Sequence, residues 1–191
     1  MDLTLASERL LLSLPETGLV ASALDFHTRN NEHLAPWSPP KPVGFETTAF
    51  WNDYVEKSHI AFLQGSVVRL WLREKSQPER VIGSAGFSQI FRGPFCNCVL
   101  GYQIDQALEG KGLMFEALQH AIAYMFVEQK LHRINANYRP ENVRSGRLLS
   151  RLGFRTDGFA PRYLFIDGEW RDHIQTSLIN DAFRPEWLSA R

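Results

Sequence analysis

The sequence predicts an α+β (mixed α/β) fold, with a mostly antiparallel central sheet of about seven strands flanked by about four helices. Two patterns support this prediction. Short stretches rich in β-branched and aromatic residues are separated by turn residues, and longer stretches repeat their apolar residues at helical spacing. Of the 191 residues, 44% are hydrophobic and 22% are charged, as in an average folded domain. This length suits one well-filled core, so we expect a single domain over residues 1–191.

In the first half of the chain, the two patterns alternate. The expected elements are, in order, a strand at 9–14, a helix from about 19, a surface loop at 33–42, a helix at 46–63, and strands at 67–72, 81–87 and 96–104. The loop is expected because its four prolines prevent a continuous helix. Polar turns separate the last three strands, so an antiparallel meander is their simplest arrangement.

The second half begins with the strongest helical pattern. The expected elements are a helix at 112–129, a strand at 133–138, a helix at 142–152 and a hairpin at 163–179. The first of these helices has a wide apolar face, which indicates that it is mostly buried. Gly153 ends the second helix, and Asp167-Gly168 forms the turn of the hairpin.

Charge and cysteine content disfavour several classes of protein. Lysine plus arginine and aspartate plus glutamate number 21 each, so a general nucleic-acid binder is not expected, although Arg139, Arg144, Arg147 and Arg151 leave a local basic patch open. Cys96 and Cys98 lack partners at zinc-ligand spacing, and we expect two strand residues on the same face in a reducing compartment, with no metal.

The N-terminus predicts the location of the protein. It is acidic, and its short apolar stretch is broken by polar residues, unlike a secretory signal. No run of apolar residues approaches the length needed to span a membrane, so we expect no membrane association and a cytoplasmic protein.

The most informative stretch runs from a strand through Gly110-Lys111-Gly112 directly into a helix. Glycines allow the backbone to approach a ligand closely, and the free N–H groups of the first helical turn, with the helix dipole, favour an anion. An ordinary strand-to-helix turn is the alternative. A nucleotide-hydrolase P-loop is excluded because Lys111 is not followed by Ser or Thr, and a dinucleotide fingerprint because position 115 is Phe115.

Two motifs, in the same order, resemble the Gcn5-related N-acetyltransferase (GNAT) superfamily. Glu109-Gly110-Lys111-Gly112-Leu113-Met114 resembles the family's loop for the coenzyme A pyrophosphate, Gln/Arg-x-x-Gly-x-Gly/Ala, with Glu109 and Met114 departing from it. Residues 142–154 resemble the family's Asn-x-x-Ser/Ala followed by Leu-x-x-x-Gly-Phe. The resemblance implies the GNAT fold, in which the central sheet is splayed in the middle to hold coenzyme A, and one N-acetyltransferase domain.

Within this superfamily, the chain resembles the RimJ/RimL-type branch, which acetylates N-termini of ribosomal proteins, and most of all the RimJ (ribosomal-protein-alanine) subgroup. The resemblance covers residues 7 to about 180. It rests on the segments Leu34–Trp37, Gly110–Leu118, His132–Ile134, Arg151–Phe154 and Ile166–His173. It implies that the chain transfers the acetyl group of acetyl-CoA to the N-terminal amine of a protein that begins with a residue of Ala or Ser type. The implied partner is a ribosomal protein, and the resemblance leaves association with the ribosome open.

The resemblance also implies the roles of residues. The residues expected to bind coenzyme A are Tyr102, Gln103, Ile104, Glu109, Gly110, Lys111, Gly112, Leu113, Met114, Asn137 and Asn142. Ser145 is the expected catalytic donor to the departing thiolate, because it occupies the position that some relatives use for this role. Many other relatives use a tyrosine, where this chain has Leu149. Trp37 and Tyr163 are expected to bind the acceptor. The amine attacks directly, without an acyl-enzyme, and its proton leaves through a water; no histidine is assigned as base.

Two other functions remain open at this point. In the first, the chain catalyses the same acetyl transfer, but the acceptor is a small-molecule amine such as a polyamine, an antibiotic or a toxin. In the second, the chain is a non-catalytic module that binds coenzyme A or the ribosome. An acceptor screen separates the first of these from acetylation of a protein N-terminus, and the absence of turnover by a chain that binds coenzyme A identifies the second.

Overall fold

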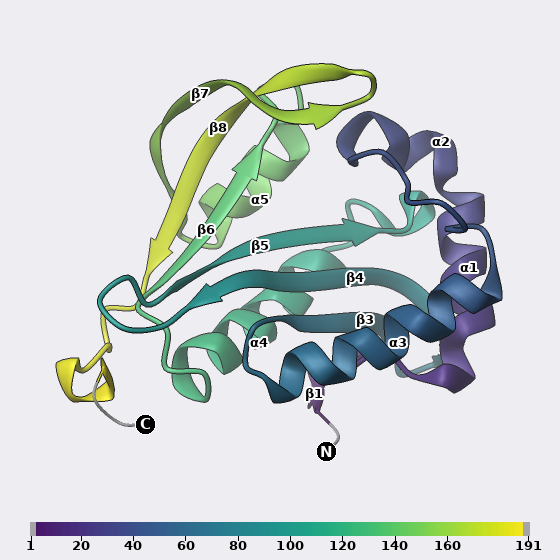
Figure 1. Ribbon diagram of the computed structural model, residues 1–191, viewed down its shortest axis with the longest axis horizontal. Coiled ribbons are helices and arrows are strands. Elements are labelled where there is room, and N and C mark those ends of the chain that lie inside the picture. The colour runs from purple at the N-terminus through teal and green to yellow at the C-terminus, as the bar shows by residue number, and fades with distance from the viewer. Residues whose placement is uncertain (1–2, 189–191) are drawn as a thin grey trace.

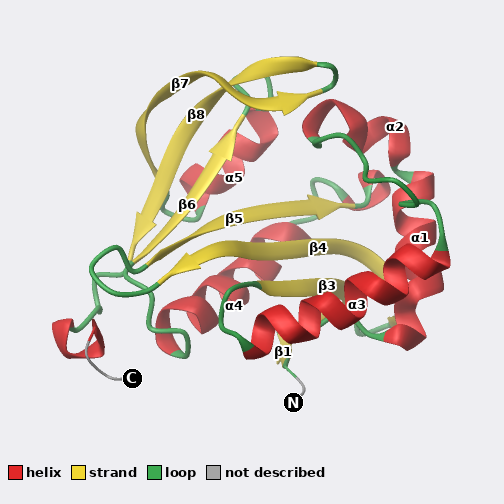
Figure 2. Cartoon of the chain, viewed as in Figure 1, coloured by secondary structure: helices red, strands yellow, loops and turns green. Residues whose placement is uncertain are grey.

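The computed structural model describes residues 3–188, which form one mixed sheet covered by helices (Figure 1). The strands are β1 (Thr4–Ala6), β2 (Leu10–Ser13), β3 (Val68–Glu74), β4 (Gln77–Phe91), β5 (Asn97–Ile104), β6 (Arg133–Tyr138), β7 (Arg155–Ile166) and β8 (Glu169–Ile179). The α-helices are α1 (Val20–Arg29), α2 (Asn31–Leu34), α3 (Thr48–Leu63), α4 (Leu113–Val127) and α5 (Val143–Arg151). Figure 2 shows helices and strands in separate colours.

The sheet order is β1-β2-β3-β4-β5-β6-β8-β7. Strands β3, β4 and β5 form the expected antiparallel meander, and the hairpin of β7 and β8 turns at the expected Asp167-Gly168. The mixed fold class is therefore confirmed. The described sheet has eight strands, one more than expected. The additional strand is β1, a three-residue segment that pairs with β2 and precedes the first strand expected from the sequence.

Two local expectations are wrong. The sequence predicts a loop over 33–42, but the end of α2 and a 3-10 turn, η2 (Ala35–Trp37), occupy its first half. Pro36 lies in the first positions of η2, where the N–H that proline lacks has no helical partner in any case. Cys96 precedes β5 with a φ of 36°, so only Cys98 belongs to the strand, although both thiols are free and buried.

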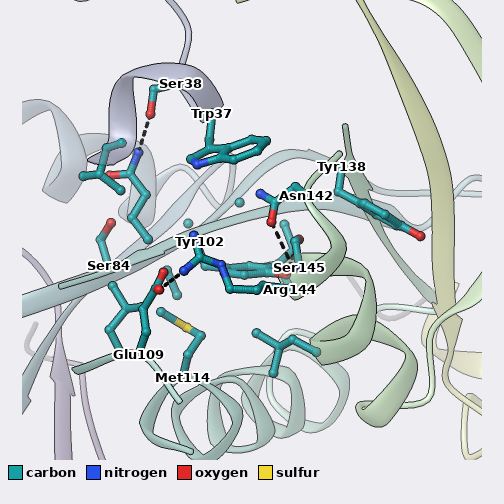
Figure 3. A pocket seen from close by; sticks show the side chains of 18 of the residues that line it. Trp37, Ser38, Ser84, Tyr102, Glu109, Met114, Tyr138, Asn142, Arg144 and Ser145 are labelled. Carbon is teal, nitrogen blue, oxygen red and sulfur yellow. Dashed lines mark hydrogen bonds and ion pairs between the residues drawn. The ribbon is translucent and has the colours of Figure 1, made fainter. Parts of the chain in front are cut away.

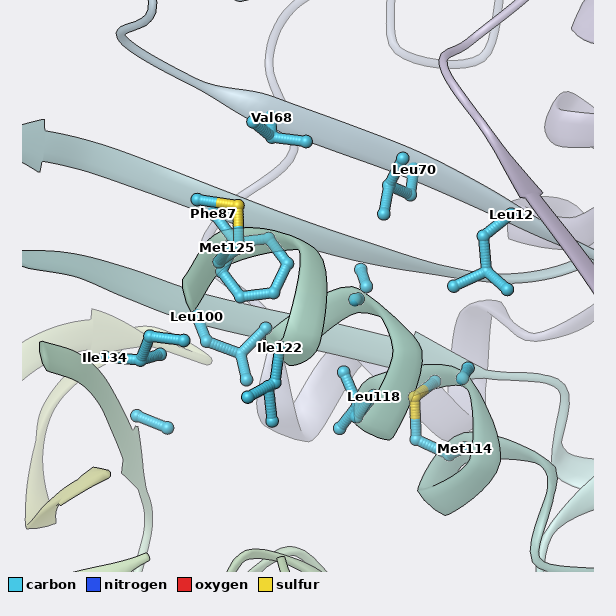
Figure 4. Close-up of a cluster of buried hydrophobic side chains, with 14 of the residues drawn as sticks. Leu12, Val68, Leu70, Phe87, Leu100, Met114, Leu118, Ile122, Met125 and Ile134 are labelled. Atoms are coloured by element: carbon cyan, nitrogen blue, oxygen red, sulfur yellow. The ribbon is translucent and has the colours of Figure 1, made fainter. Parts of the chain in front are cut away.

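Two apolar clusters lie on opposite faces of the sheet, because successive strand residues point to opposite sides. Leu70 of β3 packs with α4 residues such as Leu118 and Met125 on one face (Figure 4). Trp71, the next residue along β3, packs with α1 and α3 on the other face, against Trp51. The helix at 113–127 is mostly buried, as its wide apolar face predicted.

The sheet opens between β5 and β6, the only parallel pair among the described strands. Pairing joins Asn97, Cys98 and Val99 of β5 to β6, and within these two strands it extends no further. From there the strands diverge, so that β6, β8 and β7 separate from β5 toward the end that faces α2 (Figure 1). The edge of β5 from Leu100 to Ile104 therefore keeps backbone groups that have no strand partner on the β6 side.

Candidate active site

A cavity of about 900 Å³ passes through this opening and reaches both faces of the sheet. The Tyr102 side chain points to the face covered by α4 and α5. The Gln103 side chain and the open side of Gly101 lie on the opposite face, that of α1 and α3, and all three residues line the cavity. We call the first side the cofactor half and the second the acceptor half. Figure 3 shows the junction of the two halves.

In the cofactor half, the glycine loop ends at the N-terminus of α4. Gly110 and Gly112 have φ values of 73° and 77°, in the left-handed region that favours glycine. Gly112 is the N-cap residue of α4, and no side chain caps this helix end. The first-turn amides, at Leu113 and Met114, therefore have no intrahelical acceptor, and together with the helix dipole they form an anion site beside the cavity.

The turn between β1 and β2 holds this loop in place. Arg9 donates from its guanidinium to the Lys111 carbonyl at 3.1 Å and to Glu116 of α4 at 2.6 Å. Ser7 donates to the same carboxylate at 2.6 Å. Lys111 is exposed and does not line the cavity, and its carbonyl is the group that Arg9 holds.

The two departures from the family loop do not obstruct the anion site. The carboxylate of Glu109 bonds to His33 Nε2 at 2.9 Å and forms an ion pair with Arg144 of α5, so its charge is balanced by neighbours (Figure 3). The Met114 side chain is buried in the cluster beneath α4 and contributes to the wall of the cavity.

Arginines of α5 add positive charge next to this loop. Arg144, Arg147 and Arg151 follow each other at spacings of three and four residues, which places them on one face of the helix, and all three line the cavity. The Arg151 guanidinium lies 3.9 Å from the centre of the Phe115 ring of α4. This face and the α4 N-terminus together can hold several phosphate groups.

At the centre of the opening, the Tyr102 hydroxyl lies 2.7 Å from Ser145 Oγ (Figure 3). Burial raises the pKa of Tyr102 to about 12, more than the hydrogen bond to Ser145 lowers it, so the phenol keeps its proton at neutral pH. Asn142 accepts a hydrogen bond from the Ser145 amide at 3.1 Å and caps α5. Leu149, one turn beyond Ser145, is buried in the core and leaves the serine as the hydroxyl that α5 presents to the cavity.

The acceptor half contains Trp37 and the segment that follows it. Arg139 lies over the Trp37 ring at 5.3 Å and donates to the Pro36 carbonyl at 2.5 Å, which fixes this segment to the end of β6. Gln103 donates to Ser38 at 3.0 Å and closes the other side. Trp37 and Gln103 therefore form part of one wall.

Two further predicted residues lie at the rim of this half. Asn137 of β6 lines the cavity and donates to the Tyr163 hydroxyl at 2.9 Å. Tyr163 is not itself a lining residue, so its contact with the site runs through Asn137 and through the His173 ring, whose centre lies 5.3 Å away.

His173 of β8 is a lining residue to which the sequence analysis gave no role. It is 4% exposed, and its Nδ1 lies 3.0 Å from the Arg171 carbonyl oxygen. A carbonyl oxygen only accepts, so Nδ1 is the donor in this bond, and in the tautomer that the bond selects Nε2 is the nitrogen with the lone pair. A proton acceptor is thus present in the acceptor half. This position could not be predicted from the sequence, because only the register of β8 places His173 beside the end of β6.

Of the residues predicted to bind the cofactor, all but Lys111 border the cavity. The lining set includes Tyr102, Gln103, Ile104, Glu109, Gly110, Gly112, Leu113, Met114, Asn137 and Asn142. The described residues contain no group of three or more His, Cys, Asp or Glu side chains that could hold a metal ion. Over the same part of the chain, none of the helices has the length and apolar character needed to span a membrane.

A sheet opened between two parallel strands, with an anion site at one side and a hydroxyl pair at its centre, defines an acyltransferase of the GNAT type. A family model described as "Acetyltransferase (GNAT) domain" matches residues 9–155. The chain belongs to this family of N-acetyltransferases.

Similar proteins narrow the comparison. The chain is 41% identical over 187 residues to the [ribosomal protein uS5]-alanine N-acetyltransferase of Escherichia coli (strain K12), covering 98% of this chain and 94% of that protein. Among solved structures, the ribosomal-protein-S5-alanine acetyltransferase of Vibrio fischeri superposes with a TM-score of 0.91 at 34% identity, over 96% of this chain and all (100%) of that one. RimJ of Mycobacterium smegmatis in complex with CoA-disulfide shares the fold, with a TM-score of 0.86 at 22% identity, over 95% and 88%. The resemblance to RimJ is confirmed.

Proposed function

We propose that this chain transfers the acetyl group of acetyl-CoA to the N-terminal amine, of Ala or Ser type, of a ribosomal protein. The observation that carries the proposal is the 41% identity, over nearly the whole of both chains, to an enzyme named for acetylating the alanine of ribosomal protein uS5. Such an acceptor implies a cytoplasmic enzyme.

The residues of the cofactor half suit coenzyme A. The unpaired edge of β5 from Tyr102 to Ile104 offers backbone groups to the pantetheine amides. The amides of the 109–114 loop and the α5 arginines suit the phosphates, and this donor set requires no metal. The bound co-substrate supplies a thioester, and the chain supplies the groups that orient it and move protons.

The side chains at the opening suit direct transfer to an amine. His173 Nε2 takes a proton from the nitrogen, directly or through a water, as the N–C bond forms. As the C–S bond breaks, Ser145 donates to the departing sulfur, and Tyr102, which is protonated, donates in turn to Ser145. One proton leaves the nitrogen and one reaches the sulfur, so the reaction balances without an acyl-enzyme.

The charges of the cavity favour a peptide over a polycationic acceptor. Among the described lining residues, the only carboxylate is Glu109, and it is already paired with His33 and Arg144. In the acceptor half, Arg69 and Arg139 are positively charged. Burial, together with the charges of Lys41 and Arg29, lowers the pKa of His27 to about 4, so this lining residue is neutral at pH 7 and attracts no cation. A polyamine or aminoglycoside would meet no free acidic group there.

The test is acetyl-CoA turnover with short peptides that differ only in their first residue, and with purified uS5 as a folded acceptor. Turnover selective for Ala or Ser supports the proposal. Turnover of a polyamine or an aminoglycoside alone would move the acceptor to small molecules. Binding of coenzyme A without turnover of any acceptor, including uS5, would identify a non-catalytic module.

A further inference from the structure

The acceptor half contains an arginine, Arg69 of β3, that has no acidic partner among the described residues. Its guanidinium lies 5.1 Å from the centre of the Tyr54 ring and 3.4 Å from Ser58 Oγ, both on α3. It is partly buried and lines the cavity. A guanidinium held against an aromatic ring, without a counter-ion and partly removed from water, favours a ligand that brings a negative charge.

The floor of the cavity connects Arg69 to the place of acetyl transfer. Arg69 pairs across the sheet with Gly86, which pairs with Gly101 of β5, next to Tyr102. A Cβ atom placed on Gly86 or on Gly101 would have no other atom within 4 Å, so the space above these paired residues is open. Ser84 and Ser88 lie on the same face of β4 and border the same space.

The dimensions of this row fit a short stretch of peptide. Two strand spacings separate β3 from β5, about 10 Å. An extended peptide advances about 3.3 Å per residue, and an acidic side chain reaches a few ångströms further. When the N-terminal amine of the acceptor peptide lies at the opening between β5 and β6, the side chain of the peptide's second, third or fourth residue is therefore within reach of Arg69.

We propose that Arg69 is a specificity subsite that binds an acidic side chain at position two, three or four of the acceptor peptide. This inference rests on the proposed function, because it names the class of N-terminus that the same site selects. The subsite acts on binding of the acceptor, so its signature is a change in KM for acidic peptides.

The experiment compares peptides that begin with Ala and carry Glu, Gln or Lys at position two, three or four in turn, at saturating acetyl-CoA. The wild type is expected to prefer Glu over Gln at one of these positions by roughly tenfold in kcat/KM, the effect of a hydrogen bond to a charged group. Arg69→Gln is expected to remove this preference by raising the KM of the Glu peptide to that of the Gln peptide. Arg69→Glu reverses it, so that the Lys peptide becomes the better acceptor.

Lys57→Gln is the matched control, since Lys57 is an exposed residue of α3 that does not line the cavity and its loss changes the net charge equally. Thermal unfolding shows whether each variant is folded. The subsite is disproved if the wild type treats Glu and Gln peptides alike at all three positions, or if Arg69→Gln slows both equally. Failure of the proposed function is a different result, since then no peptide is acetylated at all.

Discussion

The two halves of the cavity are built in different ways. The cofactor half consists of the free edge of β5, the amides of the 109–114 loop and one face of α5. The acceptor half consists of side chains from η2, α3, β3, β6 and β8, brought together by folding. This contrast determines where a single substitution has an effect. Backbone groups tolerate most side-chain changes, whereas an acceptor wall made of side chains changes its selectivity with each one.

The base proposed for the acceptor half gives the largest expected effect. His173→Asn keeps a donor near the position of Nδ1 but removes the acceptor at Nε2. We expect kcat to fall by roughly 100- to 10,000-fold, the usual contribution of a general base, with the affinity for coenzyme A unchanged. Steady-state kinetics and calorimetric titration of coenzyme A measure the two quantities.

His120→Asn is the control, because His120 Nδ1 also lies 3.0 Å from a backbone carbonyl oxygen, that of Glu116, but on the exposed side of α4. It is expected to leave kcat unchanged. If His173→Asn keeps kcat within about threefold of the wild type, His173 is not the base, and a water or another group takes the proton.

The glycine loop is the point at which a side chain can damage the cofactor half. Gly112→Val forces a β-branched residue into a φ of 77°, which costs about 1–2 kcal/mol and displaces the amides of the first turn of α4. We expect the KM for acetyl-CoA to rise by roughly tenfold and the KM for the peptide to remain unchanged. Gly168→Val, with a φ of 76° at the hairpin turn, imposes similar strain away from the loop. Equal effects of the two variants on acetyl-CoA would show that strain alone is responsible.

The same contrast explains what the sequence could and could not predict. The cofactor half lies mostly in contiguous segments, residues 101–114 and 142–151, so motif and helix spacing predicted its positions. The acceptor half depends on strand register. His173 and Arg69 line the same cavity although 104 positions separate them. Arg69 belongs to no local pattern, and the Ile166–His173 segment resembles the family without indicating that its last residue faces the cavity. The four prolines of segment 33–42 predict a loop, but Pro36 also fits the first positions of a 3-10 turn, and the residue pattern alone does not distinguish the two.

The Tyr102–Ser145 pair lies in the cofactor half next to the acceptor half, and its loss should have an intermediate effect. Tyr102→Phe removes the donor to Ser145, and we expect kcat to fall by about tenfold with the affinity for coenzyme A unchanged, the loss of one hydrogen bond. Because burial raises the pKa of Tyr102 to about 12, ionisation of this group should cause no change in rate below about pH 11. A fall in wild-type kcat between pH 8 and 10 that disappears in Tyr102→Phe would contradict this assignment.

Asp105 connects the two halves, and its replacement should have the smallest effect on activity. It follows β5, and its carboxylate accepts from Arg29 of α1 at 2.8 Å and from the Ala107 amide at 3.1 Å. Burial would raise the pKa of Asp105, but these hydrogen bonds, with the charges of Arg29 and Arg80, outweigh burial and hold the pKa below its usual value. A carboxyl whose pKa is lower in the folded state stabilises the fold above the unfolded pKa of about 3.9 and loses that contribution as the pH falls through the folded value.

Asp105→Asn should therefore lower the free energy of unfolding by about 2 kcal/mol at pH 7, the scale of a hydrogen bond to a charged group, while kcat changes by less than about threefold. Urea unfolding at pH 7 and in steps down to pH 3 measures this, and the gap between wild type and variant should narrow as the wild-type carboxyl takes up its proton. Asp25→Asn removes the other acid that pairs with Arg29, a carboxylate whose side chain is 65% exposed, and should cost less than about 1 kcal/mol. A gap that stays constant with pH would mean that Asp105 acts through packing and not through its charge, and that the loop and α1 are not joined electrostatically.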